Sequence, residues 1–198
     1  MPRVSDEYRA ARREQVLGAA MRCVAREGFH RTTMADVIAE SGLSAGAVYG
    51  YFSGKNEIIL AIVTRSVGHV AESLGEITSG PRPVSPVAAL RTVLARVEEL
   101  AEGPDGDITK VIVQAWAEAA RDDEVRELVR REVDEIRQAW VALLERAQAD
   151  GTLPADADPE VTARTLVALL PGYILQRVVF GDVSPESFTA AAEALGLR

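Results

Sequence analysis

Cysteine and histidine are scarce in this chain of 198 residues. Its sole cysteine, Cys23, excludes an intrachain disulfide and a metal site built from several thiolates, and its helix-like surroundings predict a small buried thiol. The two histidines lie far apart in the sequence, and no glycine-rich phosphate loop is present. The sequence therefore lacks the usual signs of catalysis, which are a positioned nucleophile, an acid–base pair or a metal cluster. We expect neither an enzyme nor a resident cofactor or metal.

Long apolar runs are also missing. No stretch approaches the roughly 18 consecutive apolar residues that a membrane-spanning helix needs, and the first residues lack the apolar core of a signal peptide. The composition, 47% hydrophobic and 26% charged, is ordinary for a globular protein with a substantial core. We expect a cytoplasmic protein that does not enter a membrane.

Positive charge is in deficit, and the deficit is uneven. The formal net charge of −8 argues by itself against a nucleic-acid partner, because Lys and Arg dominate phosphate binding. Residues 1–65, however, hold nine Lys or Arg against seven Asp or Glu, or +2, whereas residues 66–198 hold 13 against 23, or −10. This asymmetry predicts that the N-terminal and C-terminal parts of the chain have different functions. Either a flexible arm along a phosphate backbone or a solvated helix face would account for the basic residues at the start, namely Arg3, Arg9, Arg12 and Arg13.

Apolar residues recur with a helical period almost everywhere, and no run shows the strict alternation of a half-buried strand. We therefore expect an all-α fold of about nine helices. Gly28 ends the first of them, and three prolines between Gly80 and Pro86 separate the fourth from the fifth. The predicted helices cover residues 5–26, 34–39, 45–52, from 55 to beyond 74, 87–101, 107–120, 122–149, 159–180 and 185–195.

The second and third predicted helices are short and are joined by a four-residue turn, which is the pattern of a helix-turn-helix motif packed by the helix upstream. Gly42 permits the turn, and Ser44 can cap the third helix, which would enter a DNA major groove by its N-terminus. The apolar wedge between the two helices is supplied by Val37, Ile38 and Leu43. Small residues keep the groove-facing side thin: Ala45, Gly46, Ala47 and Gly50.

An ordered set of residues extends this pattern from Gln15 to Ile62: Glu27-Gly28-Phe29 ends the first helix, threonines open the second, Gly42-Leu43-Ser44 makes the turn, Tyr49 and Tyr51-Phe52 lie in the third, and Lys55 starts the fourth. With this set the sequence resembles the tetracycline-repressor (TetR) family of regulators. The resemblance implies a DNA-binding domain at residues 1–54 and a ligand-binding and dimerisation domain at residues 55–198. It further implies a regulator, by default a repressor, that a small-molecule effector releases from a palindromic double-stranded DNA operator. The alternative is a helical ligand-binding or interaction module without DNA binding.

Residue roles follow from the resemblance by position. It places Thr33, Tyr51 and Lys55 on the DNA backbone, and the groove-facing residues are Ser44, Ala45, Gly46 and Tyr49. Phe52 we expect in the core. The groove-facing helix has no Arg, Lys, Asn or Gln for bidentate pairing with bases. We therefore predict that thymine-methyl contacts, the Tyr49 ring and DNA shape carry unusual weight in operator recognition.

The resemblance also implies that the fourth to seventh helices enclose a ligand pocket and that the last two pair across a two-fold axis into the four-helix bundle of a homodimer. Each tryptophan alone is more typical of a core residue, but as a set the aromatic residues favour a small apolar or aromatic effector. The predicted ligand-binding residues are Ile62, Ile112, Trp116, Trp140, Tyr173 and Gln176. Pro171-Gly172 predicts a kink in the eighth helix; the alternative is a helix that ends there and restarts.

Overall fold

The structure is a computed structural model that describes residues 6–196. Nine α-helices and no strand make up this part of the chain, so the predicted all-α fold is confirmed. They are α1 (Asp6–Glu27), α2 (Met34–Ser41), α3 (Ala45–Tyr49), α4 (Lys55–Ser79), α5 (Pro86–Ala101), α6 (Ile108–Ala119), α7 (Asp123–Ala149), α8 (Pro159–Val179) and α9 (Pro185–Ala194).

Helix α3 is shorter than predicted. It ends at Tyr49 instead of residue 52, because Gly50 caps it by donating its N–H to the carbonyl of Gly46 at 3.1 Å. The next two residues continue as a turn, with the amide of Phe52 bonded to the carbonyl of Val48. The other helix ends lie within two residues of the predicted ones, which is the usual uncertainty of a helix boundary.

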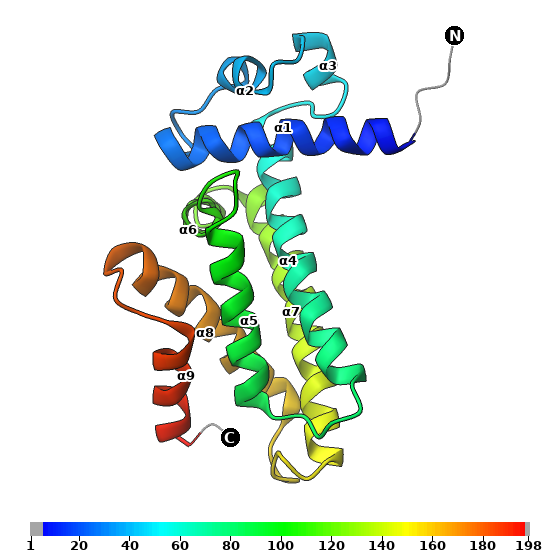
Figure 1. Ribbon diagram of the computed structural model, residues 1–198, viewed down its shortest axis with the longest axis vertical. Coiled ribbons are helices and arrows are strands. Elements are labelled where there is room, and N and C mark those ends of the chain that lie inside the picture. Colours follow the sequence, from blue (N-terminus) through cyan, green and yellow to red (C-terminus); the bar gives the residue numbers. More distant parts are fainter. Residues whose placement is uncertain (1–5, 197–198) are drawn as a thin grey trace.

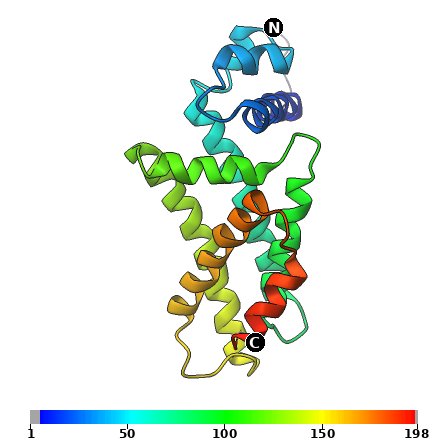
Figure 2. The same ribbon diagram turned by 90° about the vertical axis from the view of Figure 1, so that its left-hand side faces the viewer.

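The helices form an elongated molecule in which α1, α2 and α3 lie together at one end (Figure 1). Helix α4 leads from this end along α7, and α5, α8 and α9 complete the other end. Helix α6 crosses beneath α1 and joins the two parts (Figure 2). A change in α4 or α6 therefore reaches both parts of the molecule.

Two apolar clusters account for this arrangement. The first holds α1, α2 and α3 together through Leu17, Val37, Val48 and Phe52, and it also takes in Ile58 and Ile62 from the first turns of α4. The core of the N-terminal part therefore continues past residue 54 into α4.

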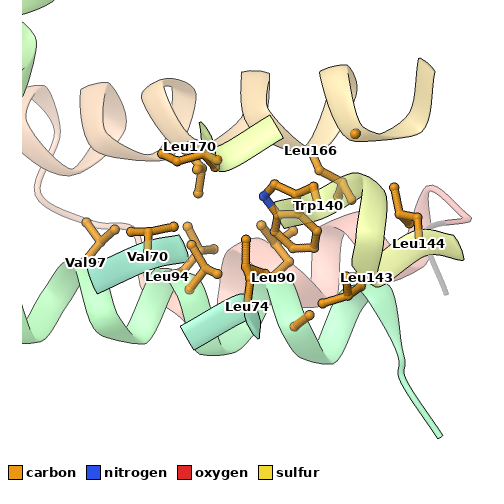
Figure 3. Close-up of a cluster of buried hydrophobic side chains, with 14 of the residues drawn as sticks. Val70, Leu74, Leu90, Leu94, Val97, Trp140, Leu143, Leu144, Leu166 and Leu170 are labelled. Carbon is orange, nitrogen blue, oxygen red and sulfur yellow. The ribbon is translucent and has the colours of Figure 1, made fainter. Parts of the chain in front are cut away.

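The second apolar cluster fills the space between α4, α5, α7 and α8. Trp140 is fully buried at its centre, among Leu74, Leu90 and Leu166 (Figure 3). Leucine and valine side chains from all four helices pack against one another there, so this end of the molecule is a helical bundle with a core of its own.

Helix α8 continues through Pro171, so it does not end and restart at the Pro171-Gly172 pair. A proline has no N–H, and the carbonyl one turn earlier, that of Val167, loses its helical donor there. Both Val167 and Pro171 line a cavity, described below, that faces the inside of the bundle.

Helix α4 is the one helix within residues 6–196 that is long and apolar enough to cross a membrane, with a mean hydropathy of 1.3 in its most apolar window. Nearly half of that window, 47%, is buried against the rest of the protein. Its packing against α7 and α5 is a sufficient reason for this composition, because a helix in the core of a protein can be as long and as apolar as one that crosses a membrane.

Candidate nucleic-acid interface and ligand cavity

The start of α2 is held by a reciprocal pair of hydrogen bonds. The Thr33 hydroxyl accepts from the amide of Asp36 at 3.2 Å, and the Asp36 carboxylate accepts from the amide of Thr33 at 2.8 Å. The same carboxylate accepts from the Thr33 hydroxyl at 2.7 Å. The bond from the Thr33 hydroxyl lowers the pKa of Asp36 most, and the bond from the Thr33 amide lowers it further, so this pKa lies below its usual range. Thr33 is exposed, but a DNA phosphate would compete with Asp36 for its hydroxyl; the predicted phosphate contact stays a prediction.

The turn between α2 and α3 has the geometry that its sequence predicts. Gly42 adopts a left-handed conformation with φ of 67°, which favours glycine. The Ser44 hydroxyl then caps α3 by accepting from the amide of Ala47 at 3.3 Å. Val48 and Phe52 are almost fully buried against α1, so the predicted core role of Phe52 is confirmed. Helix α3 is thus fixed by its inner face.

The outer face of α3 is open to solvent. Ser44, Ala45, Gly46 and Tyr49 are all exposed, and Tyr49 has 52% of its surface accessible although it is a large aromatic residue. A Cβ on Gly46 would meet no atom within 4 Å. Tyr51, by contrast, is half-buried and packs against the apolar cluster of the N-terminal part. The structure thus places the four predicted groove-facing residues together on one free surface at the end of the molecule.

Lys55 has a partner inside the protein. Its Nζ donates to the carbonyl of Phe29 at 2.9 Å and lies 4.2 Å from the centre of the Phe29 ring. The ammonium therefore ties the start of α4 to the turn that follows α1, a contact that the sequence did not predict. Its proposed grip on the DNA backbone stays a prediction beside this structural role.

The basic residues at the start of the chain lie on a helix. Arg9, Arg12 and Arg13 belong to α1, so they do not form a flexible arm; Arg3 lies outside the described residues. Arg12 donates to Gln15 at 2.6 Å, and the Arg13 guanidinium lies 5.1 Å from the centre of the Phe52 ring. A solvated helix face, the second interpretation, fits these three arginines.

An apolar cavity of about 780 Å³, including its open mouth, lies between α4, α5, α6, α7 and α8. Its lining is mostly valine, leucine and isoleucine, and it includes Ile112 and Trp116, two of the six predicted ligand-binding residues. A concave, largely apolar site with few polar groups is typical of small-molecule binding. The position of the cavity beside α4 and α6 places it next to the helices that join the two parts of the molecule.

The other four predicted ligand-binding residues lie outside this cavity. Ile62 and Trp140 are fully buried in the two apolar clusters, where neighbouring helices cover them. Tyr173 is also fully buried, and its hydroxyl donates to the Glu98 carboxylate. Burial is the main reason that the pKa of Tyr173 is raised, and the bond to Glu98 raises it further. Gln176 is exposed, since it faces away from the bundle on α8. Sequence periodicity locates the apolar face of a helix but not the point along that face where packing leaves a gap.

Glu132 on α7 is a cavity residue that the sequence reasoning missed. Its Oε1 accepts from the Thr64 hydroxyl at 2.7 Å. A signal was present, because Glu132 falls on the apolar stripe of α7 at helical spacing from Val129, Ile136 and Trp140.

Several polar contacts join α6, and the loop before it, to the N-terminal part. The amide of Phe29 donates to Gln114 Oε1, and Arg22 pairs with Asp105 at 2.6 Å. The side chain of His30 is 70% exposed and lies 3.4 Å from the Glu118 carboxylate. Helix α6 thus carries Trp116 to the cavity and Gln114 to the end of α1.

An exposed helix held by a helix-turn-helix motif, joined through α4 and α6 to a bundle with an apolar cavity, defines a ligand-responsive DNA-binding regulator. Comparison with known families agrees. A model described as bacterial regulatory proteins of the tetR family matches residues 16–62, and one described as the C-terminal part of BetI-type transcriptional repressors matches residues 81–195. The chain belongs to the TetR family of transcriptional regulators, as the resemblance of residues 15–62 predicts.

Individual relatives cover nearly the whole chain. The HTH-type transcriptional regulator YfiR of Bacillus subtilis is 26% identical over 196 residues, which are 99% of this chain and 94% of that protein. GusR of Salmonella enterica superposes with a TM-score of 0.77 at 26% identity, covering 98% and 96% of the two chains. A complex of SmeT with triclosan gives a TM-score of 0.71 at 30% identity, covering 85% and 81%. The curated relative is named as a transcriptional regulator, not as an enzyme.

Proposed function

We propose that this chain is a homodimeric repressor that holds a palindromic DNA operator and releases it when a small apolar or aromatic effector fills the cavity. In this proposal residues 1–54 bind DNA, residues 55–198 sense the effector and dimerise, and the protein acts in the cytoplasm. The observation that carries it is the path of α4. Its first turns pack Ile58 and Ile62 into the helix-turn-helix core, and its next turns line the cavity with Val63 and Val67.

An effector in the cavity would act on DNA through the spacing of the two reading helices. In a dimer these helices must reach successive major grooves, roughly 34–36 Å apart. A ligand that prefers a shifted α4 or α6 lowers the population with that spacing, and binding then weakens. Gln114 of α6 accepts from the amide of Phe29, and Lys55 of α4 donates to the carbonyl of Phe29, so this shift has two routes to the reading helix.

The dimer contact is proposed on α8 and α9. Large apolar side chains that the single chain leaves exposed gather on α8 and just after it: Val161, Leu175, Val179 and Phe180, the last 72% exposed. Exposed apolar surface of this kind is typical of an interface, and a two-fold axis would pair it with its own copy. Phe180→Glu tests this: we expect a monomer by light scattering, whereas Gln138→Glu on the exposed face of α7 should leave the dimer intact.

The effector class is supported by the apolar lining of the cavity and by the related SmeT, whose solved complex holds triclosan. An electrophoretic mobility shift with the DNA upstream of the chain's own gene tests the proposal directly. We expect a shift that a two-fold symmetric competitor removes and that apolar aromatic compounds reverse. A chain that binds such compounds and never shifts DNA would instead be a ligand-binding module.

A further inference from the structure

One charged side chain, that of Glu132, belongs to the described lining of the cavity. It projects from α7 among Val129, Val133 and Ile136, and only 9% of its surface is exposed. A carboxylate in such a place costs folding free energy unless partners satisfy it. Its presence in an otherwise apolar site therefore calls for a chemical reason.

The two oxygens of Glu132 differ. Oε1 accepts from the Thr64 hydroxyl at 2.7 Å, whereas Oε2 is buried and has no hydrogen-bond partner within the described part of the chain. Buried polar atoms in native proteins nearly always have a partner, and an exception points to a function or to a bound group. The oxygen is an acceptor, so the missing partner is a donor.

The surroundings define that donor further. Lysine, arginine and histidine are absent from the described cavity lining, so the site itself offers no cation to the carboxylate. Trp116 lies at the same cavity, and the face of an indole ring attracts cations. The remaining lining suits an apolar body.

We propose that the cavity binds a lipophilic amine in its protonated form, whose N–H donates to Glu132 Oε2 while its apolar part fills the space between α4, α6, α7 and α8. The proposal rests on the proposed function in one respect, that this cavity is the effector site. It adds the charge and the hydrogen-bonding group of the effector. A charged N–H···O bond is among the strongest that proteins make, and burial strengthens it.

The test compares three probes with one phenylbutyl body on the 198-residue chain: phenylbutylamine, its bulkier trimethylammonium analogue, which keeps the charge without an N–H, and phenylbutanol, which keeps a donor without the charge. Isothermal titration calorimetry at neutral pH gives each affinity directly. We expect the amine to bind about tenfold more tightly than either analogue, as a hydrogen bond to a charged group predicts. Glu132→Gln should remove the preference and leave the affinity for the alcohol within about twofold. Glu135→Gln, on the exposed face of the same helix, should change nothing.

Equal affinities for the three probes, tighter binding of either analogue, no binding of the amine, or an unchanged preference in Glu132→Gln would each overturn the proposal. The three-probe comparison uses only the unaltered chain, so it decides the matter even if Glu132→Gln does not fold. A mobility shift on the same preparation separates the two ideas. A chain that binds its operator, releases it with a neutral aromatic compound and ignores the amine keeps the proposed function and loses this inference. A chain that binds the amine with the expected preference but binds no DNA keeps this inference and loses the proposed function.

Discussion

The ammonium of Lys55 lies between the carbonyl of Phe29, 2.9 Å away, and the face of the Phe29 ring, 4.2 Å from its centre. One side chain thus joins Phe29, in the turn that follows α1, to the first residue of α4. A charged hydrogen bond and a cation–π contact both favour this position. Lys55, which the family resemblance assigns to the DNA backbone, therefore also holds the start of α4 against Phe29.

Lys55→Met separates these two roles, because it keeps the apolar stem and removes the charge. We expect a loss of about 1 kcal/mol in the free energy of unfolding, because a hydrogen bond and a cation–π contact stabilise a partly exposed ammonium less than a buried one. If Lys55 also binds a phosphate, the slope of log affinity against log salt for the operator falls by about one charge per monomer. Urea denaturation and mobility shifts at several salt concentrations measure the two effects. Lys110→Met, on an exposed position of α6, is the matched control; an unchanged salt slope in Lys55→Met would restrict Lys55 to the structural role.

Tyr49 and Phe52 lie three residues apart and face opposite ways, one 52% and the other 1% exposed. Tyr49→Ala should change the free energy of unfolding by less than about 0.5 kcal/mol, yet weaken operator binding about tenfold or more, because few other side chains on α3 can contact a base. Phe52→Ala should instead cost about 3–5 kcal/mol of stability. Fluorescence anisotropy with labelled operator and thermal unfolding distinguish the two variants. Normal operator affinity in Tyr49→Ala would remove that residue from the interface.

The helix-turn-helix could be predicted in detail because its signals are local. A threonine cap, a glycine in the left-handed region and a serine cap follow one another within residues 33–44, and each acts on its immediate neighbours in the chain. Gly50 was the exception, because it ends α3 early without adopting a left-handed conformation. Local chemistry thus predicted the turn and its caps, whereas the groove-facing residues of α3 were predicted from the family resemblance.

The cavity could not be predicted in the same way. Trp116 and Trp140 both lie among apolar residues at helical spacing, yet one is 42% exposed at the cavity and the other is fully buried. The difference depends on how α5, α7 and α8 pack, which is a long-range property that periodicity does not contain. Glu132 shows the converse: a charge on an apolar stripe is a local signal of a buried polar site, and α7 carries it.

Asp36 makes the start of α2 sensitive to acid. Hydrogen bonds from the hydroxyl and then the amide of Thr33 lower its pKa in the folded chain, so Asp36 stabilises the fold at pH values above the unfolded pKa of about 4. This stabilisation is lost as the pH falls through the lowered folded pKa. Asp36→Asn should therefore be less stable than the unaltered chain at neutral pH, and the difference should shrink in acid below about pH 4. Urea midpoints measured across this range check the sign; a difference that grows in acid would contradict it.

The two tryptophans offer the sharpest separation between sensing and folding. Trp140→Ala removes a fully buried ring from the centre of the bundle and should cost about 3–5 kcal/mol of unfolding free energy, since the surrounding leucines cannot close the space. Trp116→Ala removes a ring that is 42% exposed and should cost much less, while it enlarges the cavity and weakens the binding of aromatic effectors. Thermal unfolding and calorimetric titration with one aromatic ligand measure both properties on both variants. If Trp116→Ala kept full ligand affinity, the effector site would have to lie elsewhere than in this cavity, because Trp116 is the aromatic side chain that its described lining presents.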